Sequence, residues 1–120
     1  MSDVVNIEQA LQSFTECWSP RIIAELNGQH VKVAKLDGEF MWHHHDDEDE
    51  LFLVVSGTLE MHLRDRVVEI RAGELFVVPR GVEHKPVAHG EVHVVLFEPA
   101  STLNTGNLRN ERTVDRPERL

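Results

Sequence analysis

Three histidines and five acidic residues stand side by side in residues 43–50, and their spacing could build a metal site. In an extended segment successive side chains point to opposite faces, so His43 and His45 would share one face. A turn through the acidic residues can then bring Glu50 back beside them. Two imidazoles and a carboxylate form three sides of a site for a divalent transition metal. The fourth ligand should come from a distant segment, and His84 is a candidate.

Short strands must hold these side chains, and the sequence indicates them over most of its length. Strands are expected at residues 21–26, 29–36, 39–43, 51–55, 58–63, 67–70, 75–78, 83–88 and 91–97. The turn signals between them include Asn27-Gly28, Asp37-Gly38, Ser56-Gly57 and His89-Gly90. Short strands with a turn every roughly 8 to 12 residues predict an all-β sandwich or barrel. Residues 51–55 are apolar without a break, so both faces of that strand should be covered.

The two ends of the chain lack the pattern of short strands. Apolar side chains at positions 7, 10, 11 and 14 have helical spacing, so we expect a short helix over residues 7–16 with Asn6 as its N-cap. A length of 120 residues fits a single domain, with an N-terminal helix region at 1–20, a barrel at about 21–99 and a polar C-terminal arm at 100–120. We expect this arm to wrap the barrel or to stay mobile.

Composition and charge exclude several classes of protein. The formal charge of −9 would repel the phosphates of a nucleic acid, so we expect no nucleic-acid partner. The longest apolar run, residues 51–55, is far shorter than the roughly 20 residues of a membrane helix, so we expect no membrane partner either. The N-terminus lacks the pattern of a signal peptide, and the single Cys17 cannot form an internal disulfide. We therefore expect a cytoplasmic protein.

Two spaced motifs carry a family resemblance. They are His43-x-His45-x4-Glu50-x6-Gly57 and, after 15 intervening residues, Gly73-x5-Pro79-x-Gly81-x2-His84. Together they resemble the two motifs of the cupin superfamily, and the polar ending at residues 102–107 looks like its small bacterial single-domain members of the cupin 2 type. Such chains are often labelled mannose-6-phosphate isomerase-like, a label that reflects the shared fold and does not fix the activity. Two positions depart from the pattern: Gly38 is one residue closer to His43 than usual, and Ala88 replaces an asparagine.

The resemblance implies a double-stranded β-helix, or jelly-roll barrel, whose metal ligands are His43, His45, Glu50 and His84. Three imidazoles and one carboxylate suit Fe, Mn, Co, Ni, Cu or Zn, and do not suit Ca or Mg as the sole occupant. Four protein ligands leave two positions of an octahedral ion open, as in a reactive site. The alternative is that these four are ordinary surface residues of a metal-free barrel.

Four further residues are expected to line a cavity beside the metal: Met41, Phe52, Val54 and His93. The first shares strand parity with His43, and the next two share it with Glu50. The last is considered as a proton carrier if it faces the interior. The first three could equally be plain barrel core, which side chains fill in small barrels.

Two kinds of function follow from these expectations. The resemblance implies a metalloenzyme of the dioxygenase or isomerase and epimerase type with a small-molecule substrate. No second carboxylate or lysine stands out for acid–base work, so we expect chemistry centred on the metal. The alternative is a non-catalytic module that binds a small ligand or the metal alone. We also expect a homodimer through residues 21–36 and the N-terminal helix, because barrel edges need covering.

Overall fold

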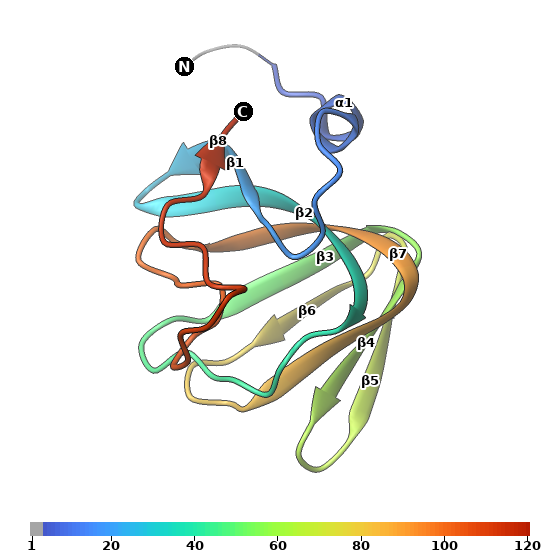
Figure 1. The fold of residues 1–120 in the computed structure, drawn as a ribbon, viewed down its shortest axis with the longest axis vertical. Coiled ribbons are helices and arrows are strands. Elements are labelled where there is room, and N and C mark those ends of the chain that lie inside the picture. The colour runs from blue at the N-terminus through green and yellow to red at the C-terminus, as the bar shows by residue number, and fades with distance from the viewer. Residues whose placement is uncertain (1–3) are drawn as a thin grey trace.

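Residues 4–120, the part of the chain that this computed structural model describes, wind most of their length into a β jelly roll with a short helix on one side (Figure 1). The elements are α1 (Ile7–Gln12), β1 (Arg21–Leu26), β2 (Gln29–Glu39), β3 (Glu50–Ser56), β4 (Thr58–Leu63), β5 (Val67–Arg71), β6 (Leu75–Val78), β7 (His84–Pro99) and β8 (Glu118–Arg119). The strand order is β5-β4-β7-β2-β1-β8, and β3 pairs with β6 and β7. The expected all-β, jelly-roll class is confirmed. The first three residues, which begin the segment tested for a signal peptide, lie outside the described residues.

Two of the expected turns do not form, and both lie in the pairing of the longest strand, β7. His89-Gly90 does not form a hairpin, because β7 runs straight through it. The strand pairs with β4 before Gly90 and with β3 after it. Asp37-Gly38 does not end β2, which pairs with β7 on both sides of a register shift at Gly38. Gly38 and Gly90 have φ angles of 85° and 90°, so each bends a continuing strand. The β2–β7 pair can therefore curl around the interior (Figure 1).

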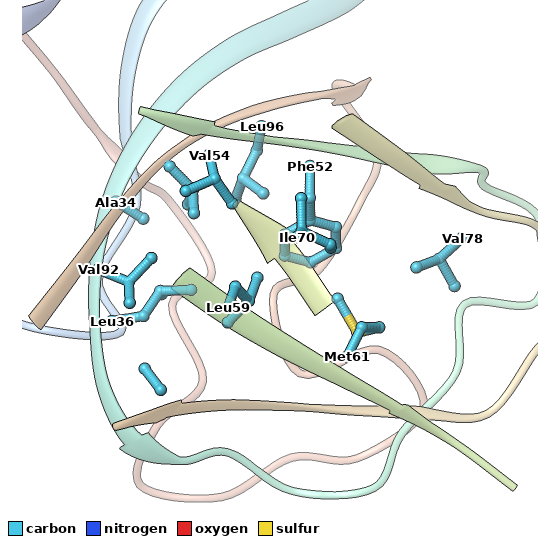
Figure 2. Packing of buried hydrophobic residues seen from close by; sticks show 12 residues of the cluster. Ala34, Leu36, Phe52, Val54, Leu59, Met61, Ile70, Val78, Val92 and Leu96 are labelled. Carbon is cyan, nitrogen blue, oxygen red and sulfur yellow. The ribbon is translucent and has the colours of Figure 1, made fainter. Parts of the chain in front are cut away.

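Alternating side chains of these strands form the apolar interior (Figure 2). Leu59 of β4 is fully buried, as its alternation with polar neighbours predicts. Phe52 and Val54 of β3 join it in one cluster. The other face of β3 is only partly covered, since Val55 is 39% exposed, so the expectation of cover on both faces is wrong. The reason is that a second cluster, between α1 and the β2–β7 pair, reaches Leu53 alone on that face.

Both ends of the described chain pack on the outside of the barrel. Asn6 Oδ1 accepts a hydrogen bond from Gln9 N at 2.9 Å, so the expected N-cap of α1 is confirmed. The helix ends at Gln12, earlier than expected, because the Ser13 hydroxyl donates to Ala10 O and closes the last turn. At the other end, β8 pairs in parallel with β1, so the arm wraps the barrel.

Within residues 4–120, no helix has both the length and the apolar character that crossing a membrane requires.

Leu59→Ala should lower the free energy of unfolding by about 2 to 5 kcal/mol, because it leaves a cavity in the interior. Val67→Ala on the neighbouring strand β5 is the matched control, since Val67 is 54% exposed and its loss should change stability by about 0.5 kcal/mol or less. Urea denaturation of the two metal-free variants measures the difference. Equal losses in both variants would contradict the packing described above.

Candidate metal centre

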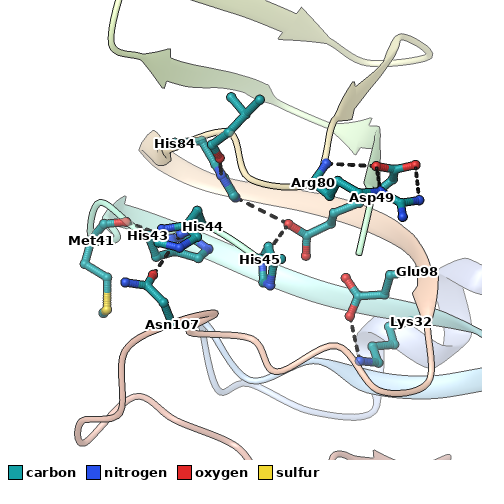
Figure 3. Close-up of polar contacts among 12 residues, drawn as sticks. Lys32, Met41, His43, His44, His45, Asp49, Arg80, His84, Glu98 and Asn107 are labelled. Carbon is teal, nitrogen blue, oxygen red and sulfur yellow. Dashed lines mark hydrogen bonds and ion pairs between the residues drawn. The ribbon is translucent and has the colours of Figure 1, made fainter. Parts of the chain in front are cut away.

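Four buried side chains from separate parts of the chain converge inside the barrel. Figure 3 labels the three histidines among them, His43, His45 and His84. Glu50 begins β3 and His84 begins β7, whereas His43 and His45 lie between β2 and β3. Their donor atoms all lie within 4.8 Å of one another, which is the scale expected around one ion with bonds of roughly 2.1 Å. Each residue is at most 4% exposed. The structure thus brings together the four residues to which the two motifs point.

Backbone hydrogen bonds hold two of the histidines side by side. His43 N donates to His84 O at 3.0 Å, and His84 N donates to His43 O at 2.9 Å. Each ring then sets its Nδ1 2.9 Å from a carbonyl two residues earlier, that of Met41 for one ring and of Val82 for the other. An imidazole that donates from Nδ1 keeps a lone pair on Nε2 for a metal. The local backbone therefore prepares both Nε2 atoms as ligands.

Buried atoms without partners indicate what the site can hold. His45 Nε2 and His84 Nε2 lie 3.4 and 3.5 Å from Glu50 Oε1. Within residues 4–120, none of these three atoms has a hydrogen-bond partner. An unpaired buried polar group costs about 1 to 3 kcal/mol, and one divalent cation would satisfy all three. Imidazole nitrogens with one carboxylate oxygen suit a transition metal, so the residues present fit such an ion.

The protonation states of the site favour metal binding. Burial and the neighbouring His84 lower the pKa of His43 to about 4, so this imidazole is neutral near pH 7. Burial acts to raise the pKa of Glu50, but Glu98, His45 and His84 beside it hold that pKa well below its usual value. A neutral imidazole and an ionised carboxylate are the forms in which these side chains bind a metal.

A cavity of about 40 Å³ adjoins the four ligands and shares His43 and Glu50 with them. Its other walls are mostly apolar, and they include Trp18 and Phe40, whose rings stack with centroids 4.8 Å apart. Phe52 also lines this cavity, in the place that its strand parity indicates. The metal site therefore borders a small apolar space on the side of His43 and Glu50.

Three other residues expected beside the metal lie elsewhere. Met41 sets its sulfur against Asn110 Nδ2 of the C-terminal arm, and Val54 packs in the apolar cluster. His93 points outward, where its Nε2 lies 2.6 Å from Glu91 Oε2 at the surface. Both faces of β7 carry apolar residues, one toward the interior and one toward α1. Strand parity therefore could not tell which face of β7 lines the barrel, and the expectation for His93 is corrected.

Glu98 and Lys32 are candidate functional residues that sequence reasoning missed. Both are 1% exposed, and Lys32 Nζ donates to Glu98 Oε2 at 2.7 Å inside the barrel. Burial and the negative charge of Glu50 raise the pKa of Glu98 well above its usual value. A second carboxyl therefore stands beside the ligands, contrary to expectation. The missed signal is the alternation in β2, where Val33 packs toward α1 and Lys32 faces inward.

The C-terminal arm closes on the histidine segment. His44 O accepts from Asn107 N at 2.9 Å, and His44 N donates to Asn107 Oδ1 at 3.0 Å. These two bonds fix the backbone between His43 and His45. A Cβ on Gly106 would come within 2.2 Å of His44 O, so only glycine allows the arm to approach this closely. A Gly-Asn pair within a polar arm is the signal that could have indicated this contact.

This chain is similar to several known proteins. A family model described as Cupin domain matches residues 29–98. The chain is 46% identical to a cupin-2 domain containing protein of Shewanella frigidimarina NCIMB 400, with a TM-score of 0.79 over 80% of this chain and 94% of that one. It is 33% identical over 109 residues to the uncharacterized protein YdbB of Bacillus subtilis (strain 168), covering 82% of this chain and 96% of YdbB. It is 25% identical over 105 residues to 3-hydroxyanthranilate 3,4-dioxygenase of Xenopus laevis, which covers 82% of this chain but 37% of that enzyme.

The metal-free protein should lose stability as the pH falls from about 6.5 to about 4. The pKa of His43 is about 4 in the folded state and about 6.5 in the unfolded state, so the unfolded chain binds the additional proton in this window. The contribution of His43 is complete above pH 6.5 and falls by about 3 kcal/mol toward pH 4. Urea titrations of the wild type and His43→Gln across this range measure it. A decline of the same steepness in His43→Gln would contradict the assignment.

Gly106→Ala should weaken metal binding by about tenfold or more, because the added methyl group displaces either the arm or the His44 backbone. Gly90→Ala is the matched control: Gly90 also has a positive φ, but nothing lies within 4 Å of a Cβ added there. Calorimetric titration of each metal-free protein with Ni²⁺ measures the affinities. If Gly106→Ala bound Ni²⁺ as tightly as the wild type, the arm would have no part in placing the histidines.

Proposed function

We propose, from the premise that this chain belongs to the cupin domain family, that it is a metalloenzyme acting on a small, partly apolar molecule. One divalent transition-metal ion would be held by His43, His45, Glu50 and His84. The observation that carries the proposal is a set of buried donor atoms without protein partners, together with an apolar cavity that two of the four residues, His43 and Glu50, line. A purely structural ion would need no such space beside it.

The ion would supply Lewis-acid chemistry, or redox chemistry if it is Fe, Mn or Cu. The side chains around the cavity have separate tasks. Trp18 and Phe40 keep water from the reacting molecule. Glu98 can hold a proton on its carboxyl at the cavity wall, since its pKa is well above the usual value.

Dioxygenation and isomerisation are the two reaction classes that this arrangement supports. The relative named 3-hydroxyanthranilate 3,4-dioxygenase supports the first, over the part of its length that this chain matches. Isomerisation needs a proton-transferring group beside the ligands, and Glu98 could provide it. We favour dioxygenation, because the apolar walls offer few partners for the many hydroxyl groups of a sugar.

His45→Ala should abolish stoichiometric metal binding, whereas His44→Ala should leave it intact. His45 is one of the four buried residues, while the His44 ring points away from them and lies 2.9 Å from Asp46 Oδ1. Elemental analysis of the untagged wild type and both variants measures the metal content, since a histidine tag would bind metal itself. The same low metal content in all three proteins would refute the metal site.

Turnover is tested on protein reconstituted with each first-row metal in turn. Oxygen uptake with catechol or a diketone would support dioxygenation, and isomerised product without oxygen uptake would support the second class. A compound that stabilises the loaded protein against heat yet is recovered unchanged would instead indicate a binding module.

A further inference from the structure

We propose that Glu98 is a substrate-binding residue that recognises a hydroxyl group, so that the cavity selects small uncharged molecules with a hydroxyl next to a metal-binding oxygen. This inference rests on the proposed function, because the ligand's metal-binding oxygen would bind the ion that His43, His45, Glu50 and His84 hold. It adds to that function a class of ligand and the residue that recognises it.

The carboxyl of Glu98 is only half satisfied by the protein. Lys32 Nζ donates to Oε2 at 2.7 Å, whereas Oε1 is buried and has no hydrogen-bond partner in residues 4–120. Glu98 lines the same cavity as His43 and Glu50, and Figure 3 shows it beside His45 on the inner side of the barrel. A buried polar atom of this kind needs a partner. A ligand hydroxyl suits it whether Glu98 is protonated or ionised, because a hydroxyl can both donate and accept.

A purely structural role would explain the Lys32–Glu98 pair less well. Buried ion pairs stabilise a fold poorly compared with apolar side chains of similar size, because both charges must leave water. Lys32 and Glu98 lie on the inner faces of β2 and β7, next to apolar residues such as Ala34 and Leu96. A structural pair would also be expected to satisfy both carboxyl oxygens, and here one faces no protein donor.

The cavity gives an anionic ligand no counter-charge. None of the described residues that line it is a lysine or arginine, and Lys32 behind it is already paired with Glu98. The Glu50 carboxylate would offset one of the two charges of a divalent cation, and the Lys32–Glu98 pair adds no net positive charge, so a phosphate dianion would not be fully balanced. The volume of about 40 Å³ also favours a small molecule. These features select against a sugar phosphate and in favour of a neutral, hydroxyl-bearing compound.

The experiment compares three probes on the Zn²⁺-loaded protein by calorimetry: catechol, 2-methoxyphenol and mannose 6-phosphate. Catechol carries two neighbouring hydroxyls, and 2-methoxyphenol has one of them methylated. We expect catechol to bind the wild type about tenfold or more tightly than either of the other two. Methylation removes a hydroxyl donor from 2-methoxyphenol, and the phosphate of mannose 6-phosphate meets no lysine or arginine in the described cavity lining. Equal binding of catechol and 2-methoxyphenol, or tighter binding of mannose 6-phosphate, would overturn the inference.

Variants then assign the hydroxyl contact to Glu98. Lys32→Met/Glu98→Leu removes the pair together, so that no buried charge is left alone, and should weaken catechol binding about tenfold or more. Glu98→Gln keeps an oxygen at this position and should retain part of the affinity. Glu91→Leu, on the exposed side of the same strand, should match the wild type. Wild-type catechol affinity in both Glu98 variants would overturn the assignment.

Zinc affinity, measured first on every protein, separates the two proposals. Failure of the wild type to bind Zn²⁺ would defeat the proposed function, and this inference with it. Normal Zn²⁺ binding without the catechol preference would defeat this inference alone.

Discussion

Burying metal-ligating side chains without protein partners is the constraint around which the rest of this structure is arranged. His45, His84 and Glu50 each keep at least one buried polar atom unpaired, which opposes folding of the metal-free chain. The surrounding backbone must therefore hold the group together by itself. The reciprocal hydrogen bonds between His43 and His84 do this on one side, and the start of β3 does it for Glu50. A metal ion bound there would recover the lost contacts, so stability and the proposed function would depend on the same atoms.

The parts of the fold that could be predicted from the sequence are those where one physical signal dominates. Asn27-Gly28 adopts positive φ at both residues and joins β1 to β2, as a tight hairpin requires. Alternation buries Leu59 because its polar neighbours leave only one apolar face. The ligand residues were predictable because their spacing matches two motifs of a known family. Strand alternation alone would not have connected His84 with residues 43–50. Glycine serves both in a tight turn and in a bend of a continuing strand. The sequence alone therefore could not show that Gly38 and Gly90 form bends.

The residues that sequence reasoning missed break the local pattern for a reason. Val31 and Val33 make the apolar side of β2 look like the interior side, yet Val33 packs toward α1 and Lys32 faces inward. A lysine and a glutamate inside a small barrel weaken its apolar packing. Conflict between pattern and position is expected at functional sites, where side chains serve chemistry rather than stability. The Lys32–Glu98 pair lies at such a place, beside the ligands and on the cavity wall.

The arm and the metal must influence each other in both directions. If Gly106 and Asn107 position the backbone at His44, a metal that needs the adjoining histidines must in turn favour the docked arm. The arm also contributes Asn104 to the cavity wall, and hydrogen bonds to Arg112 O and from Val114 N tie that side chain to the rest of the arm. A ligand that enters by displacing the arm would therefore loosen the histidines and lower metal affinity. A ligand small enough to enter beneath the docked arm would not, and this coupling is a physical reason for so small a cavity beside an open metal site.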